Sequence, residues 1–172
     1  MDAVLPVKSL LVLVSYHHKN TEKVAKVMAR VLGAPIKTPQ ETDSQELQDY
    51  DLVGFGSGIY GAKHHLALLD FAAALPQVSD GKAFIFSTSS NLEPMAKHHA
   101  PLKTILQSKG YAIVDEFTCA GFNTNSFSRL FGGLNRGRPN AEDLKNAEEF
   151  AERLKRTAST APSGAKVTSD ED

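Results

Sequence analysis

Three short polar segments each follow an apolar run, and they hold the side chains best suited to bind a polar ligand. They are residues 15–21 (SYHHKNT), 56–61 (GSGIYG) and 87–94 (STSSNLEP). Hydroxyl, amide and backbone N–H groups bind phosphates and the edges of heterocycles. Each segment also has an ordinary explanation as a turn or connector, so its significance depends on whether the fold brings the three together.

The first segment joins an apolar run to a helical pattern. A helix N-terminus offers unpaired N–H groups and partial positive charge, which suits a phosphate. Asn20 and Thr21 add side-chain donors, and Lys19 could add a positive charge. The alternative is a plain helix cap formed by Asn20 or Thr21.

The second and third segments suit a flat ligand. The glycines of residues 56–61 allow the backbone to approach such a ligand, and Tyr60 can stack on it. This segment spells GxGxxG, which is weak evidence for a dinucleotide site. In such a site the motif follows the first strand of its unit and an acid ends the next strand, whereas here it follows a later strand and no acid ends the next one. Residues 87–94 offer hydroxyl and backbone groups to a heterocycle, or form a simple polar connector.

The apolar pattern predicts alternating strands and helices. Runs rich in Val, Ile and Phe predict strands at 8–14, 34–38, 51–56, 82–87 and 111–118. Helical spacing predicts helices at 21–32, 64–75, 101–109 and 140–155. We therefore expect an α/β fold: a flavodoxin-like, doubly wound, five-stranded parallel sheet in the order 2-1-3-4-5, with about five helices on its two faces. Ligands bind such sheets beyond the carboxyl ends of the strands, where all three polar segments would meet.

The composition is that of an ordinary globular protein. The 172 residues are 41% hydrophobic and 23% charged, and the formal net charge of −1 predicts no strong attraction to nucleic acid or to an anionic membrane. We expect one domain at residues 1–157 and a disordered tail at residues 158–172, which lack an apolar pattern. We also expect no secretory signal and no membrane insertion. A single cysteine, Cys119, fits a reducing cytosol, so we expect a cytoplasmic protein.

Together the segments resemble those of the flavodoxin family. SYHHKNTEKVA is similar to the family's phosphate loop, whose pattern is a hydroxyl residue, a spacer, Ser or Thr, Gly, Asn and Thr. GSGIYG resembles the loop that stacks on one face of the isoalloxazine ring, and STSSN resembles the loop at the ring's other edge. GRPNAEDLKNAEEFAERL is similar to the final helix. The resemblance covers roughly residues 8–156 and implies a flavodoxin-like protein that binds FMN.

The resemblance also implies individual roles. Asn20 and Thr21 would bind the phosphate, Tyr60 would stack on the flavin, and backbone groups of the second and third segments would meet the pyrimidine edge. It implies no catalytic residue and no metal ligand. The expected cofactor-binding residues are Tyr16, His17, His18, Lys19, Asn20, Thr21, Ser57, Gly58, Ile59, Tyr60, Gly61, Thr88, Ser89, Ser90 and Asn91.

The six histidines come in three pairs, at residues 17–18, 64–65 and 98–99, each near a predicted helix start. One interpretation is that they are polar helix-start residues. A second is a cluster that titrates near neutral pH, so that flavin affinity or potential depends on pH between about 5 and 8. A metal site is a third interpretation, but no carboxylate or cysteine accompanies the pairs at ligand spacing.

A long connector, residues 119–138 (CAGFNTNSFSRLFGGLNRGR), follows the last predicted strand. It carries phenylalanines and only basic charges, and long loops are often functional. Either its phenylalanines pack on the body of the domain, or it forms a lid over the flavin or a landing surface for a partner or an acidic cofactor. We expect Cys119 itself to be buried and inert.

These observations predict an FMN-binding redox protein that carries electrons between partner proteins. An FMN-dependent NAD(P)H or quinone reductase is an alternative, favoured by the near-neutral charge and by the aromatic, basic connector. In that case the electron acceptor is a small molecule. A second alternative is a flavin-free interaction module, because His18 and Lys19 replace a hydroxyl residue and a glycine of the family's phosphate loop.

Overall fold

A computed structural model describes residues 6–92, 94–124, 130 and 132–160. Its sheet contains five parallel strands in the spatial order β2-β1-β3-β5-β6, which confirms the expected 2-1-3-4-5 arrangement. A sixth strand, β4 (Lys63–His64), was not predicted, and it pairs antiparallel with the end of β3. The parallel strands are β1 (Ser9–Val14), β2 (Ile36–Lys37), β3 (Leu52–Tyr60), β5 (Gly81–Ser89) and β6 (Tyr111–Ala120).

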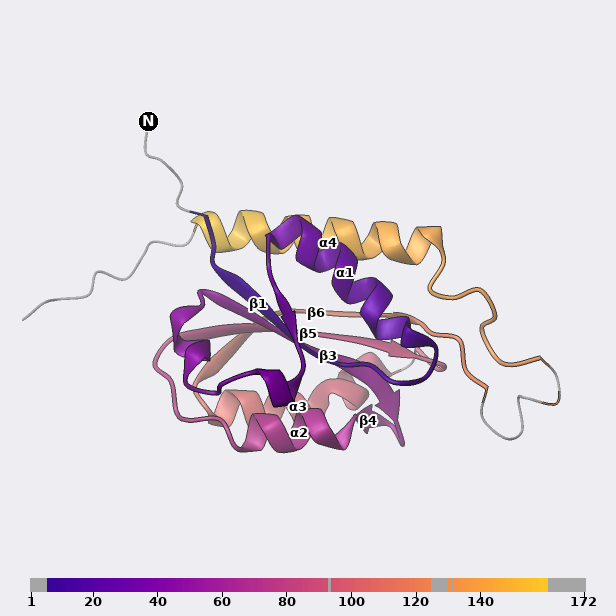
Figure 1. Cartoon of the computed structure of the whole chain (residues 1–172), viewed down its shortest axis with the longest axis horizontal. Helices are drawn as coiled ribbons and strands as arrows, with labels where there is room; N and C mark the ends of the chain where they lie inside the picture. Colours follow the sequence, from indigo (N-terminus) through magenta and orange to yellow (C-terminus); the bar gives the residue numbers. More distant parts are fainter. Residues whose placement is uncertain (1–5, 93, 125–129, 131, 161–172) are drawn as a thin grey trace, which may run out of the picture.

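Helices cover both faces of the sheet (Figure 1). Helices α1 (Asn20–Leu32) and α4 (Ala141–Thr160) lie on one face, and α2 (Leu66–Ala73) and α3 (Met95–Ser108) lie on the other. The β2–β3 connection contains two short 3-10 helices, η2 (Pro39–Glu41) and η3 (Glu46–Asp49), in place of an α-helix. The described residues therefore form four α-helices rather than about five.

Several element boundaries differ from the prediction, and three of these differences bear on the site or on the bounds of the domain. Helix α3 begins at Met95 and contains Pro101, which we had placed at its start. Proline removes one helical hydrogen bond, but the buried side chains of His98, His99, Leu102 and Leu106 continue one apolar face through it. Helix α4 extends to Thr160, so residues 158–160 are helical rather than part of a disordered tail, and residues 161–172 lie outside the described residues.

The third difference concerns β3. This strand continues to Tyr60, so most of the second polar segment is strand rather than loop. Gly61 and Ala62 then form a two-residue turn with φ of 56° and 63°, and the chain returns as β4. Turns with two positive φ values match the twist of a hairpin.

The core fills both sides of the sheet. On the α1/α4 side, Phe84 packs against Phe150 of α4, with ring centroids 5.9 Å apart. This packing requires a glycine on β3, because a Cβ built at Gly54 would lie 2.3 Å from Cζ of Phe84. The other side holds a second cluster beneath α2 and α3, which includes Leu10, Val12, Phe55, Leu68, Ile85 and Leu102.

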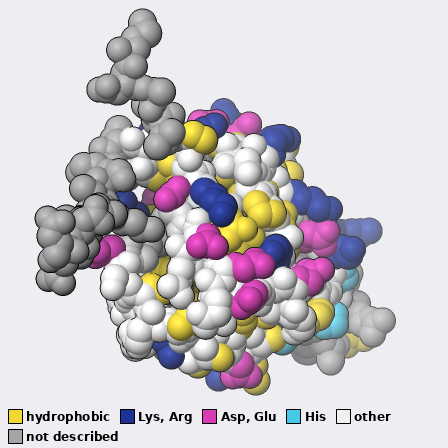
Figure 2. All heavy atoms as spheres, turned by 60° about the vertical axis from the view of Figure 1, so that its left-hand side comes forward, with side chains coloured by type: hydrophobic (Ala, Val, Ile, Leu, Met, Phe, Trp, Pro, Cys, Tyr) yellow, Lys and Arg dark blue, Asp and Glu magenta, His cyan; other side chains and the backbone are white. Residues whose placement is uncertain are grey.

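The surface carries charges of both signs. On the face in Figure 2, acidic and basic side chains are interspersed, and the histidines that this view shows lie at its right-hand edge. This mixture agrees with the formal net charge of −1. Among the helices that the structure describes, none is both long and apolar enough to cross a membrane.

Candidate functional site

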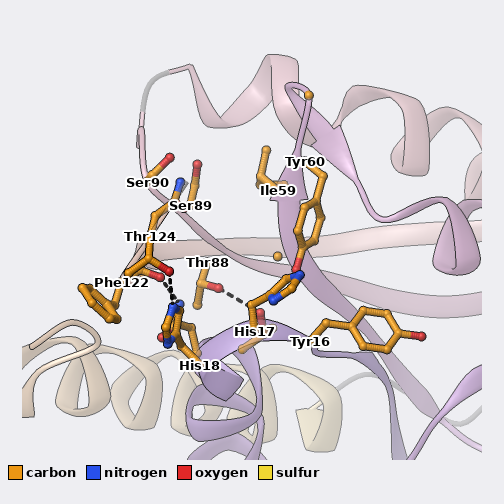
Figure 3. A pocket seen from close by; sticks show the side chains of 16 residues that line it. Tyr16, His17, His18, Ile59, Tyr60, Thr88, Ser89, Ser90, Phe122 and Thr124 are labelled. Carbon is orange, nitrogen blue, oxygen red and sulfur yellow. Dashed lines mark hydrogen bonds between the residues drawn. The ribbon is translucent and has the colours of Figure 1, made fainter. Parts of the chain in front are cut away.

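A pocket of about 460 Å³ opens at the carboxyl ends of the central strands. Its size is within the usual range for small-molecule sites, roughly 300–1,000 Å³. In Figure 3, Tyr16 and Tyr60 lie on one side, and Phe122, Thr124 and Ser90 lie on the other. The expected site residues that line the pocket are Tyr16, His17, His18, Asn20, Thr21, Gly58, Ile59, Tyr60, Gly61, Thr88, Ser89 and Ser90.

The loop after β1 has an unusual backbone. His17, His18 and Lys19 all have left-handed conformations, with φ of 30°, 56° and 52°, and Asn20 returns to the right-handed helical region at the start of α1. Successive residues of opposite hand turn their backbone N–H groups toward one concavity, which favours an anion. The first N–H groups of α1 add to it.

Asn20 and Thr21 do not cap α1. The N-cap position is Lys19, which makes no side-chain capping hydrogen bond. Instead, Nδ2 of Asn20 donates to the carbonyl oxygen of Phe122 at 2.8 Å, and the hydroxyl of Thr21 lies 2.8 Å from that of Thr88. These contacts join α1 to β5 and to the segment after β6, so the simple capping explanation is wrong.

The start of the connector after β6 forms part of the pocket. Gly121, Phe122, Asn123 and Thr124 line it, although they were absent from the expected set. The Phe122 ring packs on His18, and Nε2 of His18 lies 2.9 Å from Oγ1 of Thr124. The length and position of the connector were the sequence signal for this role. Phe127 and Phe131 lie outside the described residues.

Aromatic rings border the opposite side. Tyr60, at the end of β3, has 38% of its surface exposed, and its ring centroid is 5.3 Å from that of His65. The ring of Tyr16 also contacts His65, with ring centroids 5.0 Å apart. Burial, and secondarily the nearby Tyr16 hydroxyl, raise the pKa of Tyr60 above its usual value. Tyr60 therefore offers a neutral, partly accessible ring to the pocket.

Three expected residues do not line the pocket. Lys19 is exposed and lies 3.7 Å from the carboxylate of Glu22. Ser57 is fully buried, and its side chain points to the α2/α3 side, where its oxygen accepts the backbone N–H of His65. The backbone N–H of Asn91 donates to the hydroxyl of Ser89, which does line the pocket.

The three histidine pairs do not form one cluster. His17 and His18 line the pocket, and His65 lies between the two tyrosines. His64 and His99 are buried on the α2/α3 side, with ring centroids 5.0 Å apart. Within the described part of the chain, no group of three or more His, Cys, Asp or Glu residues could hold a metal ion.

Cys119 is buried at 5% exposure, as expected. Burial is the main reason that the pKa of its thiol rises to about 12, and the Asp143 carboxylate adds to the effect. The thiolate is the reactive form of cysteine, so this side chain stays protonated and unreactive at neutral pH.

Comparison with known proteins agrees with this geometry. Residues 11–125 match the model of the flavodoxin domain family. The chain belongs to the flavodoxin family. An uncharacterized protein of Methanocaldococcus jannaschii is 43% identical over 147 residues, which are 86% of this chain and 97% of the relative.

Solved flavodoxins share the fold at low sequence identity. Flavodoxin 2 of Bacillus cereus has a TM-score of 0.67 and 18% identity, over 87% of this chain and 99% of that structure. A flavodoxin from the domain Archaea has a TM-score of 0.63 and 13% identity, over 88% and 98%. The fold and the family together indicate a flavin-binding redox protein.

The residues that line the pocket are chemically suited to a flavin nucleotide. Among the described residues that line it, none carries a carboxylate, so none of these side chains repels a phosphate. Oδ1 of Asn20 is buried and has no partner among the described residues, so it can accept a hydrogen bond from a ligand hydroxyl. A Cβ built at Gly121 would lie 3.0 Å from Nδ2 of Asn20. The backbone at Gly121 therefore lies close to the Asn20 side chain in the wall of the pocket.

Proposed function

We propose that this chain binds FMN in the pocket and carries electrons between partner proteins in the cytoplasm. The observation that carries the proposal is the meeting, in one pocket, of an anion-favouring loop after β1, an aromatic ring at the end of β3 and neutral hydroxyl groups at the end of β5. These features match the phosphate, the ring system and the polar edge of FMN in turn.

Different groups of the chain would bind different parts of FMN. Backbone N–H groups of residues 17–21 would hold the phosphate, because the backbone there changes hand at the helix start. Oδ1 of Asn20 and the hydroxyls of Thr21 and Thr88 are placed to contact the ribityl chain. Tyr60 would cover the ring, and Gly58, Ser89 and Ser90 would meet its polar edge.

Bound FMN would supply one- and two-electron chemistry, while the protein supplies orientation and electrostatics. Tyr60 remains partly exposed at the pocket, so this side leaves a route for electrons to reach a partner. In the described part of the pocket no lining side chain is a carboxylate, so none of them would repel negative charge on the bound group.

The binding proposal is tested by titrating the purified protein with FMN and, separately, with riboflavin, which lacks the phosphate. We expect FMN to bind at least about tenfold more tightly, because one charge-assisted phosphate contact is worth roughly 1.5–3 kcal/mol. Equal affinities would remove the phosphate role of residues 17–21. Failure to bind either compound would favour a flavin-free interaction module.

A second candidate is an FMN-dependent NAD(P)H or quinone reductase. It is favoured by the segment Gly121–Thr124, which brings Phe122 to the pocket and gives it a wall suited to a small aromatic substrate. Steady-state oxidation of NADH or NADPH with a quinone distinguishes the two functions. Sustained turnover by the FMN-loaded protein alone supports the reductase, and transfer only to a protein acceptor supports the carrier.

A further inference from the structure

The hairpin that carries Tyr60 is packed at its base, where β4 contacts β3 and α3. Its tip, from Tyr60 to Lys63, is exposed, and β4 contributes only two residues to the sheet. The next residue is different, because His64 is 1% exposed and its Nδ1 lies 2.8 Å from Oγ of Ser57. The same oxygen accepts the backbone N–H of His65 at 3.0 Å. Ser57 and His64 thus join the returning strand to β3 by side-chain hydrogen bonds, in addition to the backbone pairing of β3 with β4.

The hydrogen-bond pattern favours one neutral tautomer of His64. The Ser57 hydroxyl donates to the carbonyl oxygen of Gly58 at 2.8 Å, so its oxygen must accept from Nδ1–H of His64. Nε2 of His64 then carries a lone pair, and this atom is buried without a partner among the described residues. A proton added at Nε2 would create a buried charge with no acceptor, which is strongly unfavourable.

The neighbouring charges oppose protonation as well. Burial is the main reason that the pKa of His64 lies well below its ordinary value, and His99 and His98 of α3 lower it further. Glu116 of β6 does not compensate, because Oε1 lies 3.2 Å from Nδ1 of His99 and Oε2 lies 2.8 Å from Nζ of Lys103. The remaining ionisable groups of the hairpin and α2 are turned away: Lys63 and Asp70 are exposed, and His65 contacts the two tyrosines.

We propose that His64 is a positioning residue that holds the β3–β4 hairpin, and with it Tyr60, against the pocket only while its imidazole is neutral. When the hairpin opens, His64 reaches water and can take a proton. Acid therefore favours the open form, in which Tyr60 and the backbone of residues 58–61 no longer line the pocket. The link to FMN affinity rests on the proposed function, whereas the hairpin opening does not.

Hydrogen exchange of the cofactor-free protein tests the opening directly. After correction for intrinsic exchange rates, the opening constant of the Ile59–His64 amides should rise as the pH falls from 7.5 to 5, by at most about tenfold per unit, the limit for one linked proton. His64→Asn should flatten this dependence, because Asn can donate to Ser57 but cannot be protonated. The matched control His98→Asn removes another buried histidine of the same region and should keep the dependence, over a somewhat narrower pH range because His98 helps to lower the pKa of His64.

FMN titration of the same three proteins tests the consequence. The dissociation constant of the wild type and of His98→Asn should increase in acid more steeply than that of His64→Asn. A wild-type opening constant that does not change with pH, or a His64→Asn profile identical to the wild type in both measurements, would overturn the proposal. If no variant binds FMN but the exchange results are as expected, the proposed function fails and the role of His64 stands.

Discussion

The ring of His18 packs against the ring of Phe122, with centroids 4.5 Å apart and planes inclined at 54°. His18 belongs to the loop after β1, and Phe122 lies 104 residues later, in the segment after β6. The hydrogen bond between His18 and Thr124 reinforces this contact. One wall of the pocket therefore depends on a connection between distant parts of the chain.

Replacing Phe122 with Ala should weaken FMN binding roughly two- to tenfold. Aromatic contacts of this kind contribute about 0.5–1.5 kcal/mol beyond their buried area, and without the ring His18 loses its support beside the proposed phosphate site. Fluorescence titration with FMN measures the change. Phe122→Tyr keeps the ring and should bind as the wild type does. An Ala variant with wild-type affinity would show that this wall takes no part in binding.

The hydroxyls of Thr21 and Thr88 should be energetically coupled, because they lie 2.8 Å apart in a buried environment. A double-mutant cycle with Thr21→Val and Thr88→Val, measured by urea unfolding, should give a coupling free energy of about 1 kcal/mol. Strictly additive losses in the free energy of unfolding would mean that the hydrogen bond contributes nothing.

Gly54→Ala should lower the free energy of unfolding by roughly 1–3 kcal/mol, the usual cost of overpacking. The added Cβ would lie 2.3 Å from Cζ of Phe84, which is itself held against Phe150. Combining the change with Phe84→Leu should recover part of the loss. Chemical denaturation of the three proteins checks this, and a Gly54→Ala protein as stable as the wild type would contradict the packing.

Stability should decrease in acid because of the buried histidines. The pKa values of His64 and His99 are lowered from an ordinary value of 6.5, chiefly by burial, so below pH 6.5 the unfolded chain binds protons that the folded chain excludes. Each such histidine lowers the free energy of unfolding by at most about 1.4 kcal/mol per pH unit below 6.5, until its folded pKa is reached.

Urea unfolding of the cofactor-free protein at pH 7.5, 6.5 and 5.5 measures this slope. His64→Asn should have a shallower slope than the wild type. Equal slopes for the two proteins would show that His64 is not excluded from protonation in the folded state.

The sequence predicted the sheet well because its central strands are buried on both faces, which leaves continuous apolar runs such as Leu10–Val14. It failed where a local signal was misleading. Pro101 is a strong helix-start residue, but here it lies inside α3. The glycines of residues 56–61 suggested a loop, yet Gly56 lies in a strand where it makes room for Phe86, and Gly61 lies in a hairpin turn.

The pocket was predictable in part from the order of strands and loops along the chain. Its walls after β1, β3 and β5 follow from the rule that ligands bind at the carboxyl ends of parallel strands. The segment after β6 starts at the same edge, but which of its residues reach the pocket depends on long-range contacts such as that of Asn20 with the carbonyl oxygen of Phe122. No local pattern encodes such a contact, and none reveals that Ser57 turns its side chain away from the pocket to bind His64.

A visible absorbance spectrum shows directly whether this pocket holds a flavin. The purified protein is recorded alone, after addition of FMN and removal of the excess, and after reduction with dithionite. We expect a retained flavin spectrum, in about one equivalent per chain, that bleaches on reduction. A protein that stays colourless after incubation with FMN would contradict the assignment of this pocket to a flavin.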